Sequence, residues 1–381
     1  MDYPDKFRSS ITSILIFSTL LLFTVSCDIF GGSDGNNGFS NGSDDDTFLS
    51  GPWLIPQDEI RDGGPGVDGI PSIDNPDFAS VSEIDFIPDD RMVIGIKIDG
   101  VARAYPHQIL DWHEIVNDQI GDHSFTITFC PLTGTGMCWN RKIEDEVTEF
   151  GVSGLLFRNN LIMYDRKTFS AYSQMQLRGV NGKMIETNIE TYPVIETTWK
   201  TWKEMYPESN VHTRNTGHFR NYSGYAYGSD YATNHDRILF RPLVNSDDRL
   251  QNKDRVLGII DSQNASIAAT VKVFVIEQFG EGINLVKTHV GSSNYLVVGS
   301  TEYNFAAAFK PESDHASLQF QPVQGQLPVV LEDNEGNLWD LFGQATEGPR
   351  QGEHLQHARS YIGYWFAWAD FFPTLDIYEG E

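Results

Sequence analysis

The chain has 381 residues, of which 40% are hydrophobic and 12% aromatic, enough to fill the cores of about two or three domains and to exclude a wholly disordered chain. Its 53 acidic and 27 basic residues give a formal net charge of -26, so nucleic acid, itself a polyanion, is excluded as a partner. The 34 Gly and 17 Pro favour many turns and short strands, and the predicted fold class is a β-rich α+β fold.

Residues 1–26 are predicted to be a lipoprotein signal peptide. Lys6 and Arg8 precede the apolar run Ile11–Val25, and small residues lead to Cys27. The run is too short to cross a hydrocarbon core of about 30 Å. The segment resembles a bacterial lipoprotein signal with Cys27 lipidated, which predicts a membrane-anchored protein of the cell envelope that faces the periplasm or the cell surface. The alternative is a plain secretory peptide or short anchor, with an incidental Cys27.

Residues 27–51 are rich in Gly, Ser and Asp, and they predict a flexible tether. A polar segment of this length has an r.m.s. reach of roughly 25 to 30 Å, which would hold a folded body clear of a lipid surface. The acidic run Asp44–Asp46 also permits a second interpretation, an export or sorting signal.

The folded body should begin near Trp53, and its sequence repeats itself. Three motifs return in the same order later in the chain: Val93–Ile96 as Val256–Ile259, Phe125–Thr128 as Tyr295–Val298, and Trp199–Pro207 as Trp365–Pro373. This order predicts two related lobes packed together. The predicted organisation is lobe one at 52–207 with its repeat copy at 91–207, a connector at 208–253, lobe two at 254–373 and a tail at 374–381.

Hydrophobic patterns predict the first elements of lobe one. Strands are expected at 93–98 and 125–129, with a short helix at 109–116 between them. A second helix should follow Thr197 or Thr198 and end at Pro207.

The second helix would carry an aromatic stripe. Trp199, Trp202 and Tyr206 share one of its faces, which predicts a core contact. The alternative is a platform on which a glycan stacks.

The two copies differ in polarity, and this difference locates the candidate site. Cys130 aligns with Ser300 and Cys138 with Ala308, so copy one has kept polar groups where copy two has packing residues. We therefore expect the functional site in copy one and a scaffold role for copy two. The candidate ligand-binding residues are Glu114, Asp118, Thr133, Tyr164, Asp165 and Arg166.

At these positions the chain resembles a known family, the bacterial domain of unknown function 3179. The resemblance rests on ARAYPHQIL-W-HEIVND, TFCPLTGTG and FGVSGLLFRNNLIMYDRKT-S-YSQ, and it covers about Ile55 to Pro373. It implies a shared fold and export and carries no activity. Many members resemble C-P-L-C-G where this chain has Thr133 after Leu132, so a C-x-x-C metal or redox pair is absent from this stretch.

Cys130 and Cys138 flank the turn-rich stretch Pro131–Gly136. A hairpin centred on Gly134 would place the two Cys opposite each other and allow a structural disulfide, which an exported chain permits. Two buried free thiols are the second interpretation. The spacing alone leaves both open.

A third interpretation is chemical. Cys130 would be a nucleophile beside His113, because a thiolate needs a nearby base or cation at neutral pH, and Glu114 or Asp118 would orient the imidazole. In the metal version, copper or zinc would bind His107, His113 and Cys130, although the sequence has no standard spacing of metal ligands. No nucleotide cofactor is expected, since a glycine-rich phosphate loop of standard pattern is missing from the sequence.

Tyr164, Asp165 and Arg166 follow an apolar run. They could clamp a carboxylate or a sugar, or close a turn by hydrogen bonding. Two hypotheses of function remain open, with enzymatic activity undecided. The first is an envelope protein whose copy-one pocket binds a small molecule or metal, with or without thiol chemistry. The second is a non-catalytic module for a glycan or protein ligand, in which Cys130 and Cys138 are structural.

Overall fold

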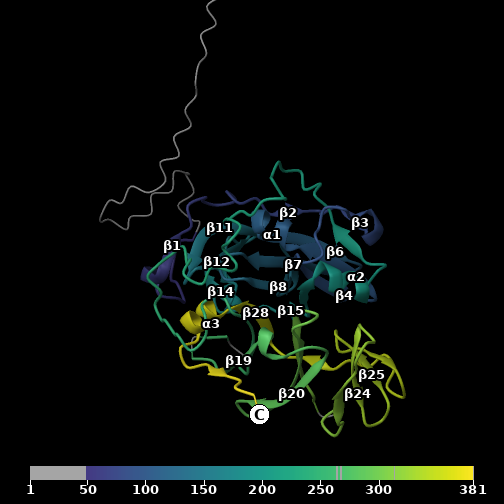
Figure 1. Ribbon diagram of the computed structural model, residues 1–381. Coiled ribbons are helices and arrows are strands. Elements are labelled where there is room, and N and C mark those ends of the chain that lie inside the picture. Colours follow the sequence, from purple (N-terminus) through teal and green to yellow (C-terminus); the bar gives the residue numbers. More distant parts are fainter. Residues whose placement is uncertain (1–48, 263–264, 267, 313, 381) are drawn as a thin grey trace, which may run out of the picture. The chain divides into compact units, whose positions relative to one another are not determined.

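The computed structural model describes residues 49–262, 265–266, 268–312 and 314–380 (Figure 1). The predicted signal peptide, Cys27 and nearly all of the tether lie outside the described residues. Residues 46–381 cluster as one unit, to which every element below belongs. Within the described part of the chain, no helix is long and apolar enough to span a membrane.

The fold is β-rich, as predicted, with several sheets and short helices. The described residues form three α-helices: α1 (His107–His113), α2 (Trp199–Met205) and α3 (Trp365–Phe371). We call residues 49–212 the first half and residues 255–380 the second half. The segment between them has no helix or strand among its described residues.

The first half contains two sheets that meet around α1. One has the order β16-β4-β5-β17-β3, and the other has the order β15-β8-β7-β6-β2. The strands of the first are β16 (Ile195–Thr198), β4 (Met92–Ile98), β5 (Val101–Pro106), β17 (Asn210–His212) and β3 (Phe78–Ser80). Those of the second are β15 (Thr191–Tyr192), β8 (Thr135–Asn140), β7 (His123–Cys130), β6 (Ile115–Ile120) and β2 (Ile73–Asp74).

A third sheet of the first half has the order β1-β11-β12-β13-β14. Its strands are β1 (Ile60–Asp62), β11 (Phe150–Phe157), β12 (Asn160–Asp165), β13 (Ala171–Ser173) and β14 (Arg178–Asn181). A two-stranded ribbon, β9 (Lys142–Ile143) and β10 (Glu146–Val147), precedes it.

The second half has three four-stranded sheets, ordered β28-β18-β19-β29, β20-β21-β22-β27 and β23-β24-β25-β26. The first consists of β28 (Ser360–Tyr364), β18 (Arg255–Ile260), β19 (Val271–Val275) and β29 (Asp376–Ile377). The second consists of β20 (Asn284–Val290), β21 (Ser293–Ser300), β22 (Phe305–Lys310) and β27 (Gln356–His357). The third consists of β23 (Phe320–Pro322), β24 (Val329–Asp333), β25 (Leu338–Asp340) and β26 (Ala345–Glu347).

Helix α2 forms where the sequence predicts it. Thr198 caps it, accepting a hydrogen bond from the amide of Thr201, and Trp199 and Trp202 are fully buried. Trp365 and Trp368 of α3 are buried as well. The core interpretation of the aromatic stripe is therefore confirmed, and these indoles offer no face to a glycan.

The prediction for α1 was partly wrong. The helix begins at His107 and ends at His113, whereas residues 115–120 form β6. Glu114 lies between them with a positive φ of 57°, so the backbone turns sharply from helix to strand at this residue.

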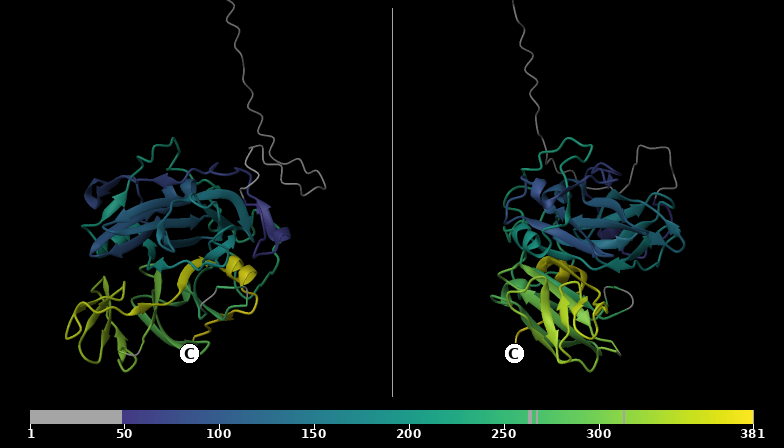
Figure 2. Two further views of the ribbon diagram at one scale, coloured as in Figure 1. Left: turned by 180° about the vertical axis from the view of Figure 1, so that it is seen from behind. Right: turned by 90° about the vertical axis from the view of Figure 1, so that its right-hand side faces the viewer.

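The two halves lie next to each other (Figure 2), and hydrogen bonds join them. The amide of Tyr364 donates to the carbonyl oxygen of Thr133 at 2.8 Å. The guanidinium of Arg255 donates to Glu196 Oε1 at 2.7 Å. These contacts place β28 and β18 beside the strands that carry the predicted site.

Candidate functional site

Cys130 and Cys138 are both buried and both free, so the predicted disulfide is absent. The pairing of β7 with β8 gives the reason. Cys130 lies opposite Thr135, and Cys138 lies opposite Ile127, because the turn closes directly after Cys130. The two thiols therefore do not face each other across the hairpin. The structure agrees with the second interpretation, in which both are buried free thiols.

His113 is engaged away from Cys130. Its Nδ1 lies 2.8 Å from the carbonyl oxygen of Pro71, and its Nε2 lies 2.7 Å from the hydroxyl of Tyr222. Burial lowers the pKa of His113 to about 4, so the ring is neutral at physiological pH. Both nitrogens have partners, and the structure does not form the predicted His113–Cys130 dyad.

The predicted metal site does not assemble either. Over the described ranges, no three His, Cys, Asp or Glu side chains are grouped so that they could hold a metal ion. His107 packs its ring against Phe129 with centroids 4.2 Å apart, and burial lowers its pKa to about 3. His107, His113 and Cys130 therefore have separate surroundings.

Glu114 is a predicted residue that lies near Cys130, as does Thr133, whose amide donates to the carbonyl oxygen of Cys130 at 3.2 Å. The side chain of Glu114 is 4% exposed, and Oε1 accepts a hydrogen bond from the hydroxyl of Tyr227 at 3.2 Å. Burial raises the pKa of Glu114 to about 8, although the Tyr227 hydrogen bond opposes the shift. The carboxyl group is therefore mostly protonated at neutral pH and can donate a hydrogen bond.

Lys253 is the cation of the site, and it sits just before β18. It is 4% exposed, and its Nζ has no hydrogen-bond partner among the described residues. Three aromatic rings surround it instead, with centroids 3.5 Å away for Tyr231, 4.6 Å for Tyr364 and 5.0 Å for Phe366. Burial lowers the pKa of Lys253 to about 7, so a substantial fraction of the amine is uncharged at neutral pH.

Cys130 is the common neighbour of these groups. It lies close enough for its thiolate form to interact electrostatically with Lys253 and with three tyrosines, and Glu114 interacts with Cys130 in the same way. Burial raises the pKa of Cys130 to about 11, so the thiol stays protonated at neutral pH. We define the Cys130 cluster as Glu114, Cys130, Tyr227, Tyr231, Lys253 and Tyr364.

Two further predicted residues serve internal networks. Asp118 accepts hydrogen bonds from Arg103 Nη1 and from the hydroxyl of Tyr105, both at 2.5 Å. The hydroxyl of Thr133 lies 2.9 Å from that of Thr135 and also 2.9 Å from Asn160 Nδ2. Their polar atoms bind groups of the chain itself.

The polar segment after β12 also binds the chain itself. Tyr164 donates to Asp68 at 2.6 Å, and Arg166 Nη1 donates to Asp74 at 2.7 Å. Asp165 accepts hydrogen bonds from the amides of Lys167 and Thr168, which closes the turn. Of the two interpretations of this segment, the turn is the one observed.

The sequence analysis missed Tyr227, Tyr231 and Lys253 because it treated residues 208–253 only as a connector. A signal was present, since Tyr222, Tyr225, Tyr227 and Tyr231 give this segment an aromatic density unlike that of a solvated linker. Tyr231 also donates a hydrogen bond at 2.8 Å to the carbonyl oxygen of Leu132, which lies two residues after Cys130 in the chain.

Comparison with known proteins adds one finding. A family model described as "Protein of unknown function (DUF3179)" matches residues 67–375, which is most of the chain. No curated protein and no solved structure matches the sequence or the fold.

Proposed function

This chain belongs to the DUF3179 family, and we propose that it is an exported, lipid-anchored envelope protein that binds a small anionic ligand at the Cys130 cluster. The observation that carries the proposal is Lys253, a buried amine without a hydrogen-bond partner among the described residues. Lipid attachment at Cys27 rests on the sequence, because that residue lies outside the described part of the chain.

We also propose that the two halves arose by internal duplication. Strand pairing supports this: β4 and β5 are antiparallel with β17 parallel to β5, and β18 and β19 are antiparallel with β29 parallel to β19. In the first half, β16 pairs with β4 and leads directly into α2, which begins with Trp199. In the second half, β28 pairs with β18 and leads directly into α3, which begins with Trp365. The site residues Glu114 and Cys130 belong to the first copy, as the sequence comparison predicts.

An anion would supply what Lys253 lacks. Burying a charged amine is costly unless it is paired, and aromatic faces compensate only in part. The lowered pKa of Lys253 is the sign of that cost. A carboxylate next to Nζ would favour the charged amine, and the ligand would then be held by a short, charge-assisted hydrogen bond.

Glu114 favours the same ligand. Since burial raises its pKa to about 8, the neutral carboxyl group can donate to an anion instead of repelling it. Tyr227 donates its hydroxyl proton to Glu114, and the thiol of Cys130 donates to the carbonyl oxygen of Asn159, so the neutral carboxyl group is the donor that can serve the ligand. With the thiol protonated, the cluster is suited to binding an anion and not to nucleophilic attack by sulfur.

Calorimetry can test this proposal with acetate as the probe. At about pH 7 Glu114 is mostly protonated and about half of Lys253 is neutral in the free protein, so acetate binding should take up protons, and the measured heat should depend on the ionisation enthalpy of the buffer. Lys253→Met should abolish both the binding and the proton uptake. Lys200→Met is the matched control, because Lys200 is exposed on α2. Undiminished acetate binding by Lys253→Met would refute the site, as would a lack of binding by the parent protein.

A further inference from the structure

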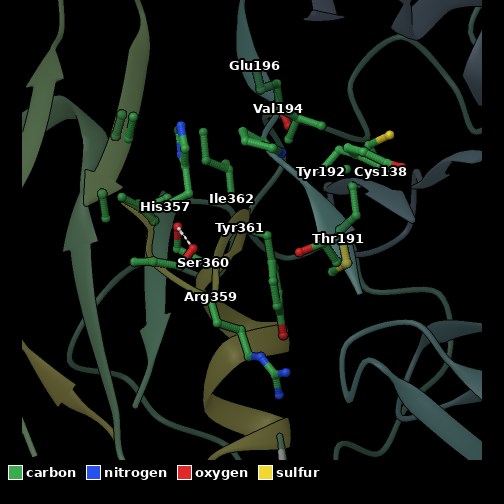
Figure 3. Close-up of a pocket in the computed structure, with 18 of the residues that line it drawn as sticks. Cys138, Thr191, Tyr192, Val194, Glu196, His357, Arg359, Ser360, Tyr361 and Ile362 are labelled. Carbon is green, nitrogen blue, oxygen red and sulfur yellow. Dashed lines mark hydrogen bonds between the residues drawn. The ribbon is translucent and has the colours of Figure 1, made fainter. Parts of the chain in front are cut away.

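A cavity separate from the Cys130 cluster lies where the two halves meet. Its volume is about 260 Å³, and it is lined by β8, β15 and β16 from the first half and by β22, β27 and β28 from the second. None of the six residues of the Cys130 cluster lines it. Figure 3 shows Glu196 and Arg359 at opposite ends of the labelled residues, with Ser360 and Ile362 between them.

Glu196 is the buried acid of this cavity. Its side chain is 4% exposed, and Oε1 accepts a hydrogen bond from Arg255 at 2.7 Å. Oε2 is buried and has no hydrogen-bond partner within the described residues. A buried carboxylate oxygen requires a donor, so this atom marks a place where the chain alone leaves a polar group unsatisfied.

Gly136 also lines the cavity and lies beside that oxygen. A Cβ at this position would lie 2.5 Å from Ile94 Cδ1 and 3.3 Å from Glu196 Oε2, so position 136 has no room for a side chain. Because Glu196 lines the cavity as well, its unpartnered oxygen belongs to the cavity wall.

The remaining wall suits an apolar group. Ala306, Ala307 and Ala308 of β22 line the cavity with the shortest apolar side chains, and Ile362 of β28 lines it as well. Ala306 and Ala308 face the same side of β22, because side chains alternate along a strand, and their small size leaves a volume that larger side chains would fill. A ligand of this cavity should accordingly combine a strong donor with a short hydrocarbon part.

We propose that this cavity binds a small organic amine, whose ammonium group donates to Glu196 Oε2 while its hydrocarbon part packs against Ala306–Ala308. A charged donor matches a carboxylate oxygen better than a hydroxyl does, because charge-assisted hydrogen bonds are the stronger class. The net charge of -26 attracts cations towards the protein.

The probes are butylamine and its neutral analogue 1-butanol, titrated into the full chain and followed by ligand-observed NMR. We expect butylamine to bind and 1-butanol to bind at least about tenfold more weakly. Glu196→Gln should weaken butylamine binding by about ten- to hundredfold. Glu190→Gln removes the same charge from an exposed position close in sequence, and it should leave binding unchanged.

A second variant keeps the test valid if Glu196→Gln fails to fold. Ser360→Leu fills the cavity from β28 and leaves Glu196 in place, so it should also abolish butylamine binding. Lys253→Met should bind butylamine normally, which separates this site from the Cys130 cluster. Equal binding of amine and alcohol, or binding that survives both Glu196→Gln and Ser360→Leu, would overturn the proposal. Failure of the parent protein to bind butylamine would mean that water alone satisfies Glu196 Oε2, and it would overturn the proposal too.

Discussion

Gly95 lies directly beneath the indole ring of Trp202, so close that position 95 has no room for a Cβ atom. Gly258 stands in the same relation to Trp368 in the second half. In each half, one strand leads into the helix, and the neighbouring strand pairs with it. That neighbouring strand has a glycine at the point where the buried Trp of the helix packs. The absence of a side chain at these two positions sets the distance between helix and sheet.

Gly95→Ala should therefore destabilise the protein. The added methyl group would push against the ring of Trp202, and overpacking of this kind costs about 1 to 3 kcal/mol in the free energy of unfolding. Urea unfolding of the variant and the parent measures the difference. In a Trp202→Leu background the same substitution should cost clearly less, and an equal cost in both backgrounds would contradict the contact.

Lys253 should make the free energy of unfolding depend on pH above about pH 7. Its pKa is lowered from 10.5 to about 7, so between these values the unfolded chain binds more protons at Lys253 than the folded chain does. The free energy of unfolding should rise with pH across this window, and Lys253→Met should lose that rise. Urea unfolding at several pH values tests this, with Lys200→Met as the variant that should keep the parent's slope.

Glu114 should change the free energy of unfolding with pH in the opposite direction. Its pKa is raised from 4.5 to about 8, so the folded chain holds a proton that the unfolded chain releases. The stability it contributes is complete below about pH 4.5 and is lost as the pH rises to about 8. Glu114→Gln should flatten this part of the stability profile. A parent and a variant with parallel profiles would show that Glu114 titrates normally.

The two internal thiols should be countable without a reductant. In a Cys27→Ala background, unfolding should expose Cys130 and Cys138 together to a chromogenic thiol reagent, because both are free. The folded protein should react slowly, since both side chains are buried. If thiols appeared only after reduction, the two residues would be oxidised in the exported protein.

Cys27→Ala should also release the protein from the membrane fraction and remove an acyl label. This follows from the signal sequence that precedes Cys27. A variant that stays membrane-bound would point to an uncleaved anchor.

Local sequence patterns predicted much of the first half. The strands expected at 93–98 and 125–129 occur as β4 and β7, and α2 follows Thr198 as expected. The error at α1 has a local cause. The β-branched residues Ile115 and Val116 pair with β7, so the helix ends three residues earlier than its apolar pattern indicated.

The hairpin that contains Cys130 shows that local sequence patterns do not predict strand register. Glycine and proline predicted the turn, yet the register depends on where the turn closes, and a shift of a few residues decides whether two thiols meet. Placing the turn centre at Gly134 was enough to predict a disulfide, whereas the observed closure pairs Cys130 with Thr135.

The Cys130 cluster was predictable only in part, for a different reason. Glu114 and Cys130 stood out by their chemistry, but Lys253 and Tyr231 reach the site from more than 90 residues away in the sequence. Tyr231, for example, follows its hydrogen-bond partner Leu132 by 99 positions. No spacing rule encodes such a contact. It depends on the packing of the connector against the first half.

The pair formed by Glu196 and Arg255 has a consequence for synthesis. The acid is made 59 residues before its cation, so a growing chain completes β16 while Glu196 still lacks Arg255. A buried acid without its cation is unfavourable, and the nascent first half cannot settle into its final packing at that stage. Final closure of the first half therefore waits for about the last third of the polypeptide, and a shortened chain that ends before Arg255 should be a substrate for chaperones and proteases.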